Sequence, residues 1–251
     1  MPYITIDGLR YYYAGELGKP GIPIIFCHGS GGGHHHWIFQ LNNLSSPINP
    51  IAIDLPGHGH SEGFPKDTVS ANSDWIHHFK EAAGIEKFIL AGHSLGGAIT
   101  IDYSLRYPEH LAGIVLIGTG GRLKVLPAIL ETFKNDDIPE EMSAYLYGPD
   151  ISDDLLKKAR REIESTPTSV FYTDLNACNQ FDVMDELSSI AIPALIICGD
   201  KDRLTPQKYS QYLKKQIPNS RIEIINNAGH MVMVEKPDAV NTAITHFAKE
   251  L

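Results

Sequence analysis

The stretch of sequence that decides the fold covers residues 88–97 and reads Phe88-Ile89-Leu90-Ala91-Gly92-His93-Ser94-Leu95-Gly96-Gly97. Its first four residues are apolar and predict a buried strand, and residues 96–107 have a helical pattern that ends before Pro108. Between them stands the pattern G-x-S-x-G, whose glycines let neighbouring backbone approach a strained turn at the serine. Such a turn exposes the hydroxyl, so we predict that Ser94 is a nucleophile rather than a simple helix cap.

Short apolar runs alternate with helical patterns on both sides of this segment. The first expected strand follows the Asp7-Gly8 turn and is predicted to be an antiparallel edge strand, whereas the later runs suit strands buried on both faces. This alternation predicts an α/β protein with a mostly parallel central sheet and helices on both faces. The expected strands cover residues 9–14, 22–27, 51–53, 88–91, 114–117, 194–198 and 222–225.

Residues 122–185 break the alternation because they contain no convincing strand. They offer helical candidates at residues 128–134, 139–147, 152–164 and 169–178. A helical insert between two sheet strands is most simply a cap over the strand ends, where α/β sheets place their ligands. We therefore expect residues 1–121 and 186–251 to form the core of one domain, with residues 122–185 as a helical cap inserted after the strand expected at residues 114–117.

Composition narrows the class of protein. The formal net charge is −9 and the basic residues form no cluster, which argues against binding to nucleic acid. Cys27, Cys178 and Cys198 are too widely spaced for a disulfide framework or a thiolate zinc site. No signal peptide is visible and no apolar run approaches the ~18 residues that a membrane span needs. We expect a cytoplasmic protein without a membrane partner; the sequence leaves its oligomeric state open.

A serine nucleophile needs a base and an acid that orients the base. His230 follows the last expected strand in Ala228-Gly229-His230, and we expect it to be the general base. The loop after the strand that ends at Cys198 offers two acids, Asp200 and Asp202. An aspartate directly after a strand often caps the loop, which suits Asp200, so Asp202 is the favoured member of a Ser-His-Asp triad.

The developing oxyanion needs backbone N–H donors. Leu95, directly after the nucleophile, is expected to supply one. The second is expected from the loop His28-Gly29-Ser30-Gly31-Gly32-Gly33, where either Ser30 or Gly31 could serve. This loop lacks the lysine of a phosphate-binding loop, so a nucleotide-phosphate site is not expected.

Three adjacent histidines, His34-His35-His36, follow the glycine loop and raise the question of a metal site. Adjacent residues on a helix point about 100° apart, so three in a row cannot all face one ion. We therefore predict that the protein uses no metal and no cofactor.

Taken together these segments resemble the α/β-hydrolase superfamily, over nearly the whole chain apart from the helical insert. Residues 54–61 look like the family's D-x-P-G-x-G-x-S stretch, and Gly199, Asp202 and Pro206 fill its G-x-x-D-x-x-x-P pattern, which is the main reason for preferring Asp202. The two ends of the insert, residues 119–123 and 181–185, are similar to those of small bacterial serine carboxylesterases with a helical cap.

The resemblance implies acyl-enzyme chemistry, since Ser94 stands where dehalogenases and epoxide hydrolases carry an aspartate. The function it favours is hydrolysis of small-molecule carboxylic esters with a small to medium acyl chain. Lactonases, C–C bond hydrolases and perhydrolases use the same triad, although C–C hydrolases usually have a longer, proline-containing His-Gly loop. A hydrolase-like receptor for a small ligand is the alternative outside enzymes. The residues expected to contact substrate are His28, Gly29, His93, Leu123, Val125, Leu126, Met142 and Tyr145.

Overall fold

A computed structural model describes residues 2–251 and contains an eight-stranded sheet with the order β1-β2-β4-β3-β5-β6-β7-β8. The pairs β1–β2 and β2–β4 are antiparallel, and every pair from β4–β3 to β7–β8 is parallel. The strands are β1 (Tyr3–Ile6), β2 (Leu9–Gly15), β3 (Ile22–Cys27), β4 (Ile48–Ile53), β5 (Phe88–His93), β6 (Leu111–Ile117), β7 (Ala194–Gly199) and β8 (Ser220–Ile225). The mostly parallel sheet confirms the predicted fold class.

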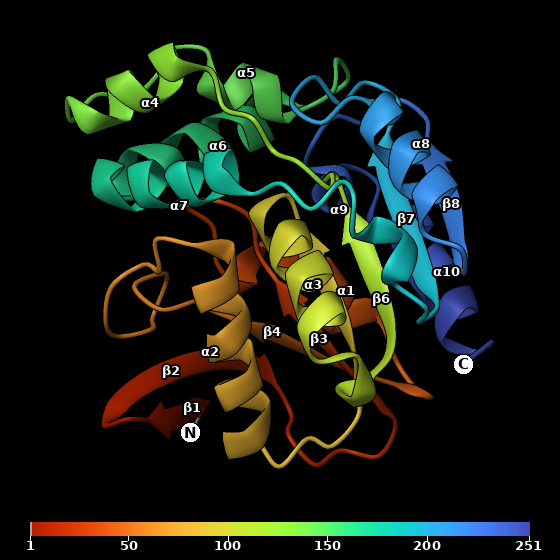
Figure 1. Cartoon of the computed structure of the whole chain (residues 1–251). Coiled ribbons are helices and arrows are strands. Elements are labelled where there is room, and N and C mark those ends of the chain that lie inside the picture. The colour runs from red at the N-terminus through yellow and green to blue at the C-terminus, as the bar shows by residue number, and fades with distance from the viewer. Residues whose placement is uncertain (1) are drawn as a thin grey trace.

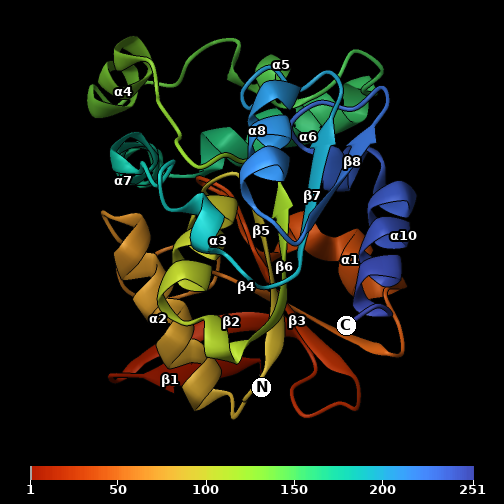
Figure 2. The same ribbon diagram turned by 45° about the vertical axis from the view of Figure 1, so that its right-hand side comes forward.

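Helices cover both faces of this sheet, as Figure 2 shows, with α2 and α3 on one side and α1 and α10 on the other. The α-helices are α1 (Ile38–Asn43), α2 (Val69–Ala82), α3 (Leu95–Arg106), α4 (Pro127–Lys134), α5 (Met142–Leu146), α6 (Asp153–Ser165), α7 (Thr168–Gln180), α8 (Gln207–Gln216), α9 (Val232–Glu235) and α10 (Pro237–Ala248). Three short 3₁₀ helices are η1 (His34–Trp37), η2 (Pro108–His110) and η3 (Leu187–Ser189).

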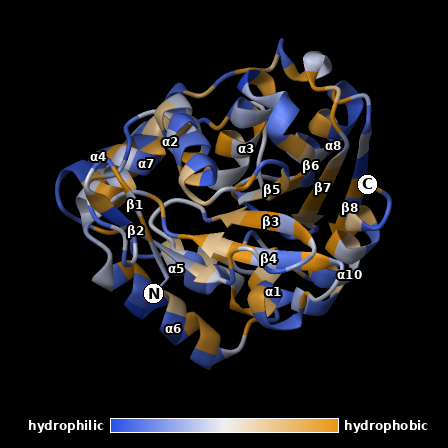
Figure 3. Cartoon of the chain, turned by 90° about the horizontal axis from the view of Figure 1, so that it is seen from below, coloured by the Kyte–Doolittle hydropathy of each residue, from blue (hydrophilic) through white to orange (hydrophobic). Residues whose placement is uncertain are grey.

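The core has two parts because successive side chains of a strand point to opposite faces. In β3, Ile25 and Cys27 pack into the cluster with α2, α3 and α8, whereas Ile24 and Phe26 pack into the cluster with α1, α9 and α10. All four side chains are fully buried. Burial on both faces explains the continuous apolar runs of the parallel strands, which form the hydrophobic centre of the view in Figure 3.

The segment between β6 and β7 carries α4, α5, α6 and α7, which lie together across one end of the sheet (Figure 1). This is the end at which β5 leads into α3, so the four helices cover the carboxyl ends of the central strands. The expected helices at 128–134, 139–147, 152–164 and 169–178 correspond to them, with α5 shorter than expected. No helix among residues 2–251 is long and apolar enough to cross a membrane.

Candidate active site

Ser94 occupies the sharp turn between β5 and α3, with φ 53° and ψ −113°. This left-handed conformation is strained for a residue with a Cβ and needs support from its surroundings. The Ser94 N–H donates to the carbonyl oxygen of Ile117 at 2.9 Å, and the Thr119 hydroxyl donates to the Ser94 carbonyl oxygen at 2.8 Å. A Cβ on Gly96 would lie 2.3 Å from the Cys27 carbonyl oxygen, so only glycine fits there. The turn is therefore held in place from two neighbouring strands.

His230 and Asp202 are brought together on the loops that follow β8 and β7. The Nδ1 of His230 donates to Oδ2 of Asp202 at 2.8 Å, and both side chains are buried. The Thr205 hydroxyl also donates to that oxygen, at 2.7 Å, while the N–H groups of Leu204 and Thr205 donate to Oδ1 at 2.9 and 2.8 Å. With Nδ1 protonated, the Nε2 of His230 is the nitrogen left to accept a proton.

Asp200, the competing acid in the sequence, makes different contacts. Its carboxylate pairs with the Lys201 ammonium at 2.9 Å and accepts a long hydrogen bond of 3.4 Å from the Ala228 N–H. Asp200 thus fastens one loop to the next, which is the local role that its position directly after a strand indicates. The carboxylate that contacts His230 is that of Asp202.

The charge state of Asp202 follows from its partners. Burial raises the pKa of this carboxyl, but the electrostatic interaction and hydrogen bond with His230, together with the hydrogen bonds from Thr205, outweigh burial and hold the pKa below its usual range. Asp202 is therefore an anion at neutral pH. A fixed anion at Nδ1 can stabilise an imidazolium if the ring is protonated at Nε2.

The segment between β6 and β7, which carries α4 to α7, is called the cap segment below. Beneath it lies a cavity of about 330 Å³ that is lined by Ser94, His230 and Ser30. All five cap residues that the sequence analysis named for substrate contact, Leu123, Val125, Leu126, Met142 and Tyr145, line this cavity. Further lining residues come from elements that sequence reasoning did not assign to the site: Leu175 and Cys178 of α7, Thr205, and Tyr209 of α8. The walls are mostly apolar, although the cationic side chains of Lys124 and Arg203 also line the cavity.

Gly29 and His93 line a second, smaller cavity of about 100 Å³ that also opens on Ser94 and His230. His28 lines neither cavity. Its Nδ1 donates to the Gly29 carbonyl oxygen at 2.8 Å and its Nε2 accepts from the Leu55 N–H at 3.1 Å. The expectation that His28 contacts substrate is therefore corrected: the buried ring uses both nitrogens to fix the loop, because a buried polar side chain must find partners.

The two loop candidates for the oxyanion site differ in what they already bind. The Gly31 N–H donates to Oδ2 of Asp174 at 2.8 Å, whereas no hydrogen bond from the Ser30 N–H is present in the part of the chain that the structure describes. Leu95 is the first residue of α3, so its N–H has no partner within the helix. Leu95 and Ser30 are thus the residues with N–H groups left for an oxyanion.

Asp174 comes from α7 of the cap segment and is 1% exposed. It holds Gly31 and also accepts a hydrogen bond from Nε2 of His58 at 2.9 Å. Gly31 has φ 65° and lies against Phe171 of the same helix so closely that a Cβ would approach that ring to 2.1 Å. Sequence reasoning missed Asp174, because one acid on a cap helix gives no sign of a partner 143 residues earlier.

His58 gives this contact a pH dependence. Burial lowers the pKa of the imidazole, but the charge and hydrogen bond of Asp174 outweigh it and raise the pKa above the ordinary 6.5. A raised pKa in the folded protein adds stability that is fully present below pH 6.5 and is lost as the pH rises through the folded value.

We expect the melting temperature of the wild type to exceed that of His58→Gln most at about pH 6, with the difference shrinking toward about pH 9. Thermal melts of both proteins across this range check the prediction. His78→Gln, which changes an exposed histidine of α2, is the matched control. A difference between wild type and His58→Gln that stays constant with pH would contradict the assignment.

The three adjacent histidines do not share one environment. His34 turns to Asp54, with Nδ1 2.9 Å from Oδ1. His35 and His36 instead direct Nε2 at the same oxygen, Oε1 of Glu162 on α6, at 2.5 and 2.6 Å. The expectation that three in a row cannot meet at one point is consistent with this arrangement. The sequence did not indicate that two of the histidines would contact the same residue of a distant helix.

Comparison with known proteins places the chain among enzymes of this architecture. A family model described as alpha/beta hydrolase fold matches residues 22–237. The structure of a thermophilic esterase is 34% identical, with a TM-score of 0.86, over 99% of this chain and 96% of that chain. A thermophilic esterase from Thermogutta terrifontis is 25% identical, with a TM-score of 0.87, over 99% of this chain and 97% of that chain. A 2-hydroxy-6-oxo-6-phenylhexa-2,4-dienoate hydrolase from Comamonas testosteroni is 25% identical over 96% of this chain and 91% of that protein.

Proposed function

Because this chain belongs to the α/β-hydrolase superfamily, we propose that it is a carboxylesterase that cleaves esters of small to medium acyl chain through Ser94, His230 and Asp202. The observation that carries the proposal is that Ser94 and His230 both line one largely apolar cavity. Asp202 contacts His230 and thereby orients its ring. A buried, anionic acid and a strained serine turn are features that a purely structural role would not need.

The chemistry follows from the position of each group. His230 removes the proton of the Ser94 hydroxyl at Nε2 as Oγ attacks the ester carbonyl carbon. The negative charge on the former carbonyl oxygen is stabilised by the N–H groups of Leu95 and Ser30. The tetrahedral intermediate collapses, His230 gives its proton to the leaving alcohol, and the acyl group stays on Ser94. Water then repeats the sequence, which releases the carboxylic acid and restores the serine.

The cavity supports an acyl chain rather than a polar group as the portion held beneath the cap. Its volume of about 330 Å³ lies at the lower end of the ~300–1,000 Å³ typical of ligand sites. Apolar side chains dominate the wall, among them Val125, Ile129, Phe133, Met142 and Leu175. Burying a chain methylene there stabilises the bound ester by about 0.8 kcal/mol. The kcat/KM for an ester should therefore rise with the length of its acyl chain until the chain fills the cavity.

The test is hydrolysis of p-nitrophenyl esters from acetate to dodecanoate. We expect kcat/KM to increase from acetate, to peak at a short or medium chain, and to fall for the longest esters, because the cavity is too small to hold them. Turnover within the ordinary enzymatic range of about 1–10³ s⁻¹ supports a catalyst over a receptor. Absence of turnover on every ester would overturn the carboxylesterase proposal in favour of a C–C bond hydrolase, a lactonase, a perhydrolase or a small-ligand receptor.

A variant of the cavity wall sharpens this test. Ile129→Trp on α4 adds bulk to a residue that lines the cavity, so the preferred chain should become shorter while short esters are still cleaved. Ala128→Trp, one residue earlier on the exposed side of the helix, is the matched control and should keep the wild-type preference. The same chain-length profile in all three proteins would mean that this cavity does not hold the acyl chain.

A further inference from the structure

His35, His36 and Glu162 form a cluster of metal-ligating side chains that the proposed reaction does not use. One atom from each of the three, a nitrogen or a carboxylate oxygen, lies within 4.8 Å of the others. The two histidines belong to η1, which continues the chain from the glycine loop, and Glu162 belongs to α6 of the cap segment. The cluster therefore joins two parts of the molecule more than 120 residues apart in sequence.

The donors match the preferences of zinc. Two imidazole nitrogens and one carboxylate oxygen are a ligand set found in zinc sites, with metal–ligand distances of about 2.0–2.2 Å. Both histidines already direct Nε2 at the same oxygen, at 2.5 and 2.6 Å, which is shorter than the ordinary ~2.7–3.2 Å for an N–H···O hydrogen bond. Ligands of one tetrahedral ion at these distances lie about 3.3–3.6 Å apart. The three side chains are thus close enough to share an ion, and they would separate by about 1 Å to admit it.

A second observation concerns the space beside the cluster. The Nδ1 of His36 has no hydrogen-bond partner among the residues that the structure describes, but it lies across the ring from Nε2 and is not one of the proposed ligands. His36 and Glu162 also line the smaller cavity beside Ser94, so there is room next to them for a water molecule as a further ligand.

From these contacts we propose that His35, His36 and Glu162 bind one divalent transition-metal ion of the zinc class. The ion would bind only when α6 lies over η1, because its ligands come from both. It would thus hold the cap segment against η1, which directly follows the loop of residues 28–33. Its ligands are distinct from Ser94, His230 and Asp202, so the inference does not depend on the proposed esterase activity.

A lysine near the cluster provides a second test of the proposed site, in which the expected change in metal affinity has the opposite sign. Lys158, one turn before Glu162 on α6, places a positive charge on the same helix as this ligand. A cation next to a metal site weakens binding by electrostatic repulsion. Removing that charge with Lys158→Gln should therefore tighten metal binding, whereas removing a ligand should weaken it.

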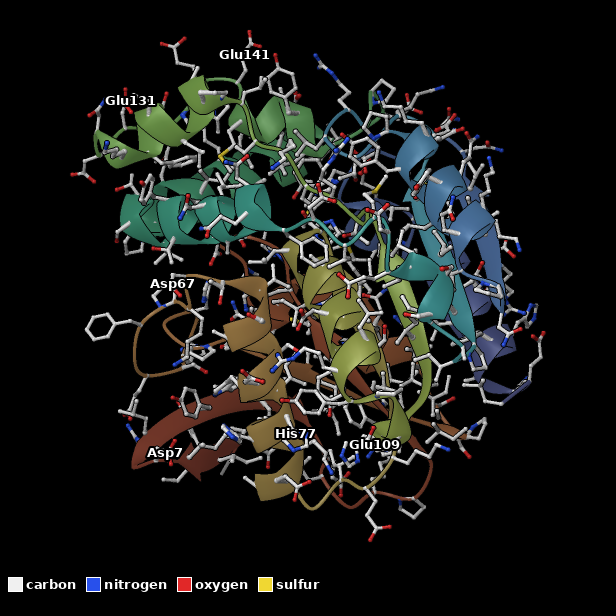
Figure 4. All side chains as sticks on the ribbon, viewed as in Figure 1. Asp7, Asp67, His77, Glu109, Glu131 and Glu141 are labelled. Carbon is white, nitrogen blue, oxygen red and sulfur yellow. The ribbon has the colours of Figure 1, made fainter. Side chains whose placement is uncertain are left out.

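The chain contains another cluster that the experiment must separate. His77, Glu81 and His110 also bring three donor atoms together. Glu81, however, is engaged in an ion pair with Lys80, which competes with a metal for the carboxylate. Figure 4 shows His77 on α2, at the end of the molecule away from the cap segment. The parent protein of the experiment and all of its variants therefore carry His110→Gln, which removes this second cluster and leaves the proposed site unchanged.

The experiment titrates tag-free protein with Co²⁺, whose visible absorption reports the ligand set, and then displaces Co²⁺ with Zn²⁺. We expect about one ion per chain, affinity at least about tenfold weaker in His36→Gln and in Glu162→Gln, and tighter binding in Lys158→Gln. Glu164→Gln on the same helix is the matched control and should bind like the parent. Zn²⁺ should also raise the melting temperature of the parent and not that of Glu162→Gln.

Circular dichroism of each variant shows whether it is folded, and His35→Gln replaces any ligand variant that is not. Lack of Co²⁺ or Zn²⁺ binding by the parent would overturn the proposal and leave Glu162 as a hydrogen-bonding partner of the two histidines. Equal affinity in Glu162→Gln and Glu164→Gln would also overturn it, since the ion would then be bound elsewhere.

Discussion

Replacing Ser94 with alanine is expected to lower kcat for p-nitrophenyl esters by about 10⁶-fold, because the acyl group then has no oxygen on the enzyme to which it can transfer. His230 and Asp202 would remain paired, since their contact does not involve Ser94. The melting temperature should therefore change little, and substrate should still bind. The measurement is steady-state hydrolysis with the ester that the wild type prefers.

Ser70→Ala, at an exposed serine of α2, is the control for the substitution itself and should keep full activity. Mass spectrometry of wild type mixed with a slowly turned-over ester should find the added acyl mass on the peptide that contains Ser94. Activity of Ser94→Ala within tenfold of wild type, or an acyl group on another residue, would exclude the proposed nucleophile.

The second large effect concerns the acid. Asp202→Asn is expected to reduce kcat by about 10⁴-fold, because an amide can donate to Nδ1 of His230 and thereby place the ring proton on Nε2, where it blocks the transfer from Ser94. The Leu204 and Thr205 N–H groups can still donate to the amide oxygen, so the loop should keep its shape. Steady-state kinetics at neutral pH measure the loss.

Asp200→Asn is the matched comparison, two residues away on the same loop. It removes the pairing with Lys201 but no contact with His230, so its kcat should be close to that of the wild type. The reverse result, a large loss in Asp200→Asn and near-normal activity in Asp202→Asn, would show that the loop rearranges in solution and that the other acid orients the base.

The turn at Ser94 and the parallel strands could be predicted from sequence because their causes are local. The apolar run before Gly92, the glycines around Ser94 and the helical pattern after it all act within one short segment, and they describe the turn that the structure contains. The mostly parallel sheet followed from strands whose residues are apolar on both faces. The preference for Asp202 over Asp200 needed family resemblance, since either acid could follow β7.

Some strands were shortened or missed for reasons that are also local. β4 begins at Ile48, but Asn49 and Pro50 are unfavourable strand residues, so only residues 51–53 were expected. β1 was not expected because it has only four residues and becomes a strand by pairing with β2 across the Asp7-Gly8 turn. Pairing partners of this kind are a property of the fold and not of the four residues.

The contacts between cap segment and body were beyond sequence reasoning. Asp174 meets Gly31 and His58, and Glu162 meets His35 and His36, only after the helices have folded over the sheet. Each acid looks like an ordinary polar residue of an amphipathic helix. Long-range pairs of polar residues have no periodicity, so no pattern along the chain indicates them.

Asp174 has a consequence for how this enzyme could be re-engineered. Its carboxylate accepts a hydrogen bond from the Gly31 N–H, which leaves Ser30 as the neighbouring donor. The cap segment therefore helps to shape the loop that we propose binds the oxyanion. A cap grafted from a relative would have to bring an acid to the same place, or the buried His58 ring and Gly31 amide would lose their acceptor. Exchange of α4 and α5 alone, with α7 retained, is therefore the route by which new substrate pockets can be installed on this scaffold.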